Sequence, residues 1–70
     1  MQAPSEFWVL RDTRGEFYAY SDQDGVRCTD RIEIARKYFT RKGATVAMTN
    51  LSKAYGKQTE PKLYRLTYHP

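Results

Sequence analysis

The stretch EFWVLRDTRGEFYAYSD, residues 6–22, decides the fold because it has the pattern of a β-hairpin crowded with aromatic side chains. Residues 6–11 have strong strand preference, and residues 16–21 form the returning strand. Between them, Asp12 and Gly15 occupy the first and fourth positions expected of a type I turn. Five of the chain's ten aromatic residues lie in this hairpin.

Side-chain alternation sorts the predicted hairpin into two faces. A three-residue loop places Val9 opposite Ala19, Leu10 opposite Tyr18 and Trp8 opposite Tyr20. One face then carries Phe7, Val9, Phe17 and Ala19, and the other carries Trp8, Leu10, Tyr18 and Tyr20.

Two helices are predicted after the hairpin. Asp24 and Gly25 indicate a further turn that leads into a short strand at residues 26–28. Asp30 is then expected to cap a first helix, with Glu33 closing a capping box. Its apolar side is formed by Ile32, Ala35, Tyr38 and Phe39. Thr40 is expected to cap a second helix that runs from about Arg41 to Tyr55 and ends at Gly56.

A final strand completes the predicted fold. Residues 62–68 alternate, with Tyr64, Leu66 and Tyr68 on one face and Leu63, Arg65 and Thr67 on the other. The whole chain, residues 1–70, is therefore expected to be a single small α+β domain. Its antiparallel sheet should have three or four strands with two helices on one face, in the order ββ(β)ααβ.

The composition excludes several classes of protein. The only cysteine, Cys28, and the only histidine, His69, cannot form a disulfide or build a zinc site, and a single cysteine is typical of a reducing cytoplasm. No signal peptide and no membrane-spanning segment are expected. A catalytic base beside a nucleophile and a glycine-rich phosphate loop are both missing. We therefore expect no catalytic residues, no cofactor and no bound metal.

Charge is distributed unevenly along the chain. Residues 1–30 carry a net charge of −3 and residues 31–70 a net charge of +7. The densest basic group is formed by Arg36, Lys37, Arg41 and Lys42, around the junction of the two predicted helices. Such a cluster is a candidate for binding phosphate or an acidic surface. The alternative is that these side chains are only a solvated surface.

The second candidate site is the aromatic face of the hairpin. If the helices cover the Phe7 face, then Trp8, Leu10, Tyr18 and Tyr20 point outward, where they would bind a protein partner or stack on bases. An exposed aromatic face would also allow a homodimer through the sheet. The alternative is that Trp8 and Leu10 enter the core and the tyrosines shield the sheet edges.

The order of these signals resembles small phage-encoded accessory proteins. The resemblance rests on the segments Gly15-Glu16-Phe17-Tyr18 and Thr29-Asp30-Arg31-Ile32, followed by Ala35, Phe39-Thr40 and Ala44 or Ala47. It covers roughly residues 7–51. The resemblance implies a protein that acts by binding host macromolecules, a class that includes anti-CRISPR and other anti-defence inhibitors.

Together these features predict a non-enzymatic binding protein. The first hypothesis is a phage-type inhibitor or modulator that binds a host protein handling nucleic acid, such as a CRISPR effector, or its complex with nucleic acid, in the host bacterial cytoplasm. The alternative is a module that binds nucleic acid directly through the basic helix junction and exposed sheet aromatics. No membrane partner is expected under either hypothesis.

Overall fold

The computed structural model describes residues 5–66 and confirms the α+β class. Its elements are β1 (Ser5–Asp12), β2 (Phe17–Asp22), β3 (Gly25–Thr29), α1 (Arg41–Tyr55) and β4 (Thr59–Leu66). The four strands form one antiparallel sheet in the order β3-β2-β1-β4. The predicted extension of the last strand to Tyr68, and His69 after it, lie outside the described residues.

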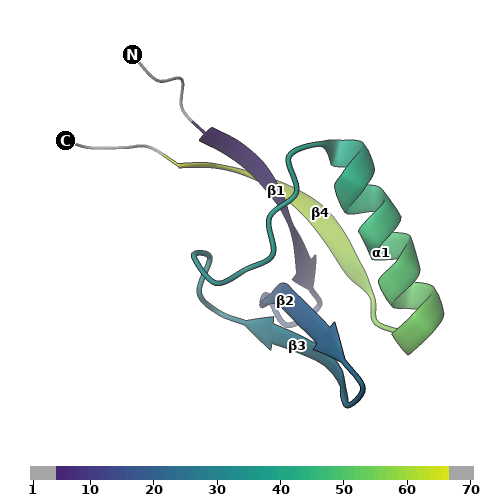
Figure 1. Cartoon of the computed structure of the whole chain (residues 1–70). Coiled ribbons are helices and arrows are strands. Elements are labelled where there is room, and N and C mark those ends of the chain that lie inside the picture. The colour runs from purple at the N-terminus through teal and green to yellow at the C-terminus, as the bar shows by residue number, and fades with distance from the viewer. Residues whose placement is uncertain (1–4, 67–70) are drawn as a thin grey trace.

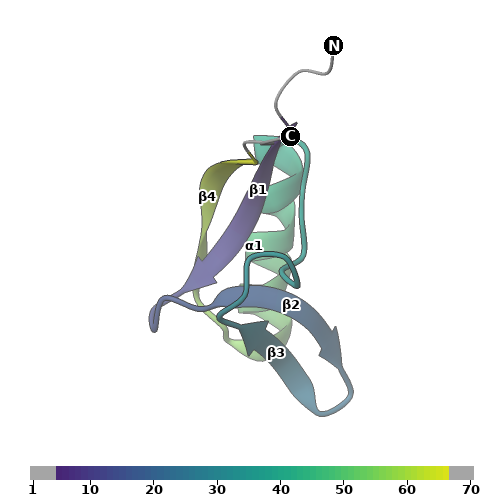
Figure 2. The same ribbon diagram turned by 90° about the vertical axis from the view of Figure 1, so that its left-hand side faces the viewer.

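The sheet consists of two ribbons that diverge. Strands β1 and β4 pair along their whole length, from Ser5 opposite Leu66 to Asp12 opposite Thr59. Strands β1 and β2 pair only at Arg11 and Phe17, which has the offset predicted from the turn. Figure 2 shows β2 turning away from β1 immediately after this contact. The predicted pairing of Trp8 with Tyr20 therefore does not form.

Residues 31–40, which we call the strap, fill the gap that β2 leaves. The amide and carbonyl groups of Trp8 bond to those of Tyr38 at 2.6 and 2.8 Å, and the Arg36 N–H donates to the Tyr18 carbonyl at 2.9 Å. Figure 1 shows this segment passing from β3 back along β1 before the chain enters α1. The strap thereby closes an edge of β1 that would otherwise be open to pairing.

The prediction of a first helix is wrong, because the strap contains a single turn instead. The turn is closed by the N–H groups of Ile34 and Ala35, and the side chain of Thr29, not of Asp30, accepts the Arg31 N–H at 3.1 Å. Beyond Ala35 the backbone bonds to strands β1 and β2, so it cannot also make the bonds of a helix.

The second predicted helix is confirmed as α1, with the predicted bounds. Thr40 is its N-cap, and its hydroxyl accepts the Gly43 N–H at 3.0 Å. Gly56, with φ of 67°, ends the helix in the left-handed conformation that glycine adopts without strain. Ala44 and Leu51 are buried against the sheet. Among the described residues, α1 is too short and too polar to cross a membrane.

The core has two clusters, one for each predicted face of the hairpin. Phe7, Val9 and Phe17 pack with Ala35 of the strap. Leu10 packs with Ala44 and Leu51 of α1. Of the two alternatives for the hairpin, the open Trp8 face does not form, because Ala35 of the strap packs on one face and α1 packs on the other.

Candidate binding surface

The four hairpin residues predicted to bind a partner do not form one exposed face. Leu10 is completely buried, and Trp8 and Tyr18 are half-buried against the Leu10 cluster. Only Tyr20 is mainly exposed, at 55%. The structure shows the alternative in which Trp8 and Leu10 pack into the core. Leu10 therefore has no exposed surface that could contact a partner.

The four residues of the predicted basic cluster also do not form one exposed site, because Lys37 stabilises the strap. Its ammonium group lies 3.2–3.3 Å from the carbonyl oxygens of Ile32, Glu33 and Ala35. It also lies 5.4 Å from the centre of the Phe7 ring. The Ile32 carbonyl also accepts the Ala35 N–H that closes the single turn of the strap, so the Lys37 ammonium group adds a second donor there. Lys37 is therefore occupied within the fold, unlike the other three cations.

Arg36, Arg41 and Lys42 remain exposed around the start of α1. The guanidinium groups of Arg36 and Arg41 lie 6.0 and 5.9 Å from the ring centres of Tyr38 and Trp8. Among the described residues, none of the three cations forms an ion pair with a carboxylate. Trp8 of the hairpin and Tyr38 of the strap, both half-buried, thus each lie next to one of these cations.

The first turn of α1 contains Arg41 and Lys42 and no acidic residue. The N-terminal end of a helix carries a partial positive charge, so cations there are unfavourable by about 0.3–1 kcal/mol each. Residues that oppose a local preference, such as cations at a helix N-terminus, are expected mainly at functional positions when no other contact compensates for them. An acidic partner would neutralise both the cations and the helix end.

Phe39 lies beside these cations and is the most exposed large apolar residue of the described chain, at 79%. It directly precedes the N-cap, where an apolar side chain commonly packs on the fourth helical residue. Here that residue is Ala44, which is small and buried in the cluster of Leu10 and Leu51, and Phe39 stays exposed. Sequence reasoning missed Phe39 because it assigned it to the core of a helix that does not form.

We call Arg36, Phe39, Arg41 and Lys42 the basic–aromatic corner. Tyr38 links it to a hollow of about 210 Å³ between α1 and β2, whose aromatic lining is Tyr18, Tyr38 and Tyr55. Burial raises the pKa of Tyr38, so this hydroxyl stays protonated at neutral pH. The corner lies at the N-terminal end of α1, and the hollow extends from Tyr38 to Tyr55 at its C-terminal end.

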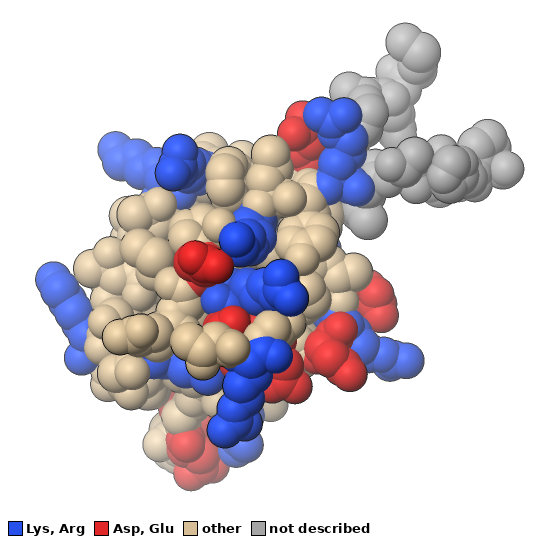
Figure 3. All heavy atoms as spheres, turned by 180° about the vertical axis from the view of Figure 1, so that it is seen from behind, with Lys and Arg blue, Asp and Glu red and all other residues tan. Residues whose placement is uncertain are grey.

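Charges on the face of the molecule seen in Figure 3 are mixed. Figure 3 shows the surface from behind, where Lys and Arg side chains are scattered and Asp and Glu side chains stand among them. Elsewhere in the described chain, four ion pairs join exposed groups, for example Lys62 with Glu60 at 3.2 Å. The face seen in Figure 3 therefore presents no single sign of charge to a partner.

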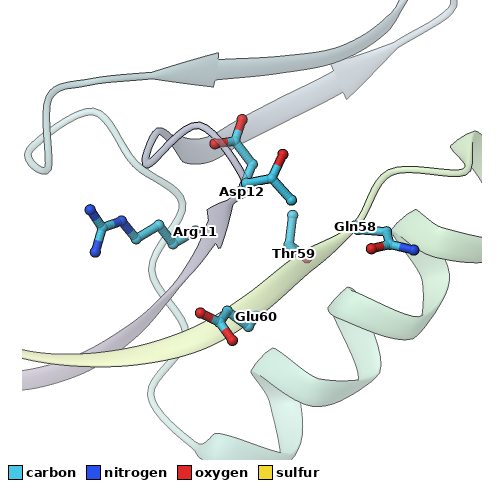
Figure 4. A pocket seen from close by; sticks show the side chains of 6 residues that line it. Arg11, Asp12, Gln58, Thr59 and Glu60 are labelled. Carbon is cyan, nitrogen blue, oxygen red and sulfur yellow. The ribbon is translucent and has the colours of Figure 1, made fainter.

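A hollow of about 240 Å³ lies where the end of β1 meets the start of β4. Figure 4 shows that Arg11, Gln58 and Glu60 extend in different directions around it and that the Asp12 carboxylate points away from Glu60. Side chains that diverge cannot act together on one bound molecule.

Asp12 beside this hollow is buried and fully engaged in the fold. One carboxylate oxygen accepts the N–H groups of Arg14 and Glu16, both at 2.9 Å, and the other accepts from the Lys57 ammonium at 3.2 Å. Burial alone would raise the pKa of Asp12, but the bonds from Glu16, Lys57 and Arg14 outweigh it and hold the pKa below its ordinary value. Asp12 therefore fixes the predicted turn and ties it to the end of α1.

Cys28 is half-buried in β3, and its thiol is not activated. Burial raises its pKa, and the nearby Asp12 carboxylate raises it further in spite of the Lys57 charge. A protonated thiol is a poor nucleophile. The described residues also hold no cluster of His, Cys, Asp and Glu that could bind a metal ion.

Comparison with known proteins assigns no family to this chain. No protein-family model, no curated protein and no solved structure matches it significantly. Function is therefore inferred from the surfaces described above together with the sequence resemblance to small phage accessory proteins.

Proposed function

We propose that this protein is a small non-catalytic binding protein that docks on a partner through its basic–aromatic corner. One observation carries this proposal, namely that Phe39 is 79% exposed beside three cations that form no ion pair with a carboxylate within residues 5–66. An aromatic anchor surrounded by charge is typical of binding hot spots. The cations would steer the approach of an acidic surface.

The partner that we propose is a host protein that handles nucleic acid, with this chain as its phage-type inhibitor or modulator. The resemblance to small phage accessory proteins supports this class of partner. The charge of the corner adds a restriction, because cations would be repelled by the basic groove in which such a protein holds nucleic acid. We therefore expect docking on an acidic patch of the partner, outside that groove.

Replacing Phe39 by serine should remove partner binding and leave the fold intact. The side chain is almost entirely exposed, so the loss of stability should be within about 0.5 kcal/mol. Loss of a hot-spot aromatic should weaken binding by about 2 kcal/mol, or roughly thirtyfold. The measurement is quantitative comparison of proteins retained from nuclease-treated bacterial lysate by the immobilised wild type and variant, followed by titration of the purified partner.

Val46→Ser provides the matched control for this experiment. Val46 is 52% exposed on α1 and lies outside the corner. A partner retained by the wild type and by the Val46 variant, but lost with the Phe39 variant, would support the proposal. Equal retention by all three would show that the corner is not the docking site.

Direct binding of nucleic acid is the second candidate function, and the composition of α1 favours it. The helix contains no acidic residue, and its exposed side chains include Lys42, Thr49, Asn50 and Lys53. Such a surface can follow a phosphate backbone. Of the hairpin residues expected to stack on bases, only Tyr20 is mainly exposed. This weakens the second candidate function relative to the first.

Titration against labelled single-stranded DNA, duplex DNA and RNA separates the two functions. If nucleic acid binds, log K should fall steeply with log salt, and Arg41→Gln combined with Lys42→Gln should reduce that slope by about 1.5. Asp22→Asn, at the end of β2, is the control and should leave the slope nearly unchanged. A complex that is lost at near-physiological salt, or a slope that the double variant leaves unaltered, would eliminate this candidate.

A further inference from the structure

The outer edge of β4 is the longest strand edge that the described fold leaves open. β4 is the last strand of the sheet, spans eight residues and pairs only with β1. The other edge, β3, has five residues and pairs with β2 through an irregular register. Short and irregular edges are poor templates for another strand, whereas a long regular edge is a good one.

Hydrogen bonds elsewhere in the sheet show which backbone groups of β4 face outward. The N–H and C=O of Trp8 both bond to the strap, so they point away from β4. Leu63 is the direct partner of Trp8, so its own N–H and C=O point away from β1. By alternation, Pro61 and Arg65 also direct their backbone groups outward. Pro61 has no N–H, but an N–H at this position would point away from β1. The proline therefore does not disturb the pairing of β4 with β1.

The side chains of β4 do not block this edge. Leu63 is 50% exposed beside Trp8. Lys62 and Arg65 already pair with Glu60 and Glu6 of the same chain, at 3.2 and 3.4 Å. Unpaired lysine or arginine commonly protects an open edge, but here each cation has a carboxylate of the same chain beside it. The edge thus offers backbone donors and acceptors, an apolar side chain and little net charge.

We propose that β4 pairs with β4 of a second copy of this chain, antiparallel and centred on Leu63. Antiparallel pairing of identical strands is self-complementary, as a two-fold symmetric dimer requires. In this register Leu63 of each copy exchanges N–H···O bonds with Leu63 of the other, and the Arg65 N–H reaches the Pro61 carbonyl. Lys62 then faces Tyr64. A register centred on Lys62 would instead oppose two lysines, which is unfavourable.

The dimer would be a continuous sheet that joins the two copies through their β4 strands. Both α1 helices would lie on the same face, because the two-fold axis of such a pair stands perpendicular to the sheet. The basic–aromatic corner is not part of the contact, so this inference does not depend on the proposed function.

Sedimentation velocity over a concentration series tests the dimer. The wild type should shift from monomer to dimer with increasing concentration. Leu63→Pro removes an outward N–H that the monomer does not use, and Leu63→Asp brings two like charges together at the two-fold axis. Each variant should weaken association at least tenfold, while circular dichroism shows the fold retained. Val46→Asp is the matched control, because Val46 is 52% exposed and lies away from β4.

Each outcome either supports or overturns the proposed dimer, whether or not β4 also binds another protein. Weakened association in both Leu63 variants, with the Val46 and Phe39 variants dimerising as the wild type does, would support it. If Leu63→Pro proves unfolded, the Leu63→Asp result alone decides. A wild type that stays monomeric at every concentration would overturn it, even if β4 binds a foreign strand. A dimer insensitive to Leu63→Asp would overturn it as well.

Discussion

Replacing Asp12 by alanine should lower the free energy of unfolding by about 3 kcal/mol. The variant leaves the N–H groups of Arg14 and Glu16 without their acceptor and deprives Lys57 of its ion-pair partner. For a domain of this size the melting temperature should fall by about 15 °C. Urea denaturation followed by circular dichroism gives the free energy directly.

Asp22→Ala is the matched control for this prediction. Asp22 accepts a backbone N–H from Asp24 at 2.9 Å, and it lies 3.8 Å from Arg27, but the group is exposed. Its removal should cost less than about 1 kcal/mol. Equal losses in the two variants would contradict the special role assigned to Asp12.

The same carboxylate makes the stability depend on pH. Because the pKa of Asp12 is lowered from its ordinary value of 3.8, the stabilisation is fully present above that value. It is lost as the pH falls through the folded-state pKa. The difference in unfolding free energy between the wild type and Asp12→Asn should therefore be constant at neutral pH and shrink below pH 3.8. A difference that grows on acidification would show that the pKa is raised instead.

Leu10→Ala should destabilise the domain by about 3 kcal/mol, because it opens a cavity beneath α1. Leu10 is completely buried and packs with Ala44 and Leu51. A domain of 70 residues has a total stability of roughly 4–10 kcal/mol, so the variant should be only marginally folded. The measurement is the midpoint of urea denaturation with its slope.

Tyr20→Ala is the matched comparison for the stability of Leu10→Ala. Tyr20 comes from the same predicted face of the hairpin but is 55% exposed, so its loss should change the stability by less than about 0.5 kcal/mol. Similar small effects at both positions would place Leu10 at the surface, as the open-face hypothesis requires. Binding experiments are better based on Phe39 than on Trp8, whose removal would disturb the core.

Features that depend on neighbouring residues could be predicted from the sequence. The turn at Asp12 and Gly15 has the predicted offset because an aspartate side chain bonds to nearby N–H groups and glycine tolerates a positive φ. The bounds of α1 follow from Thr40 and Gly56 in the same way. The division of the hairpin into two sets of side chains follows from strand alternation alone.

The strap could not be predicted in this way. Asp30, Glu33 and the apolar spacing favour a helix locally, but β2 departs from β1 and leaves backbone groups of Trp8 and Tyr18 without partners. Those groups lie more than fifteen residues away along the chain, and bonding to them outweighs the local preference. The same rearrangement binds Lys37 to three carbonyls, exposes Phe39 and packs Ala35 on the Phe7 face of the hairpin.

The sequence by itself thus determined the turn, the helix α1 and the sorting of hairpin side chains, since each depends on contacts within a few residues. Only the tertiary structure decided which aromatic and basic side chains remain available to a partner. The physical reason is that availability depends on what packs over a residue from distant parts of the chain. Leu10 is buried because α1 packs over it, and Phe39 is exposed because the strap pairs with β1 instead of forming a helix.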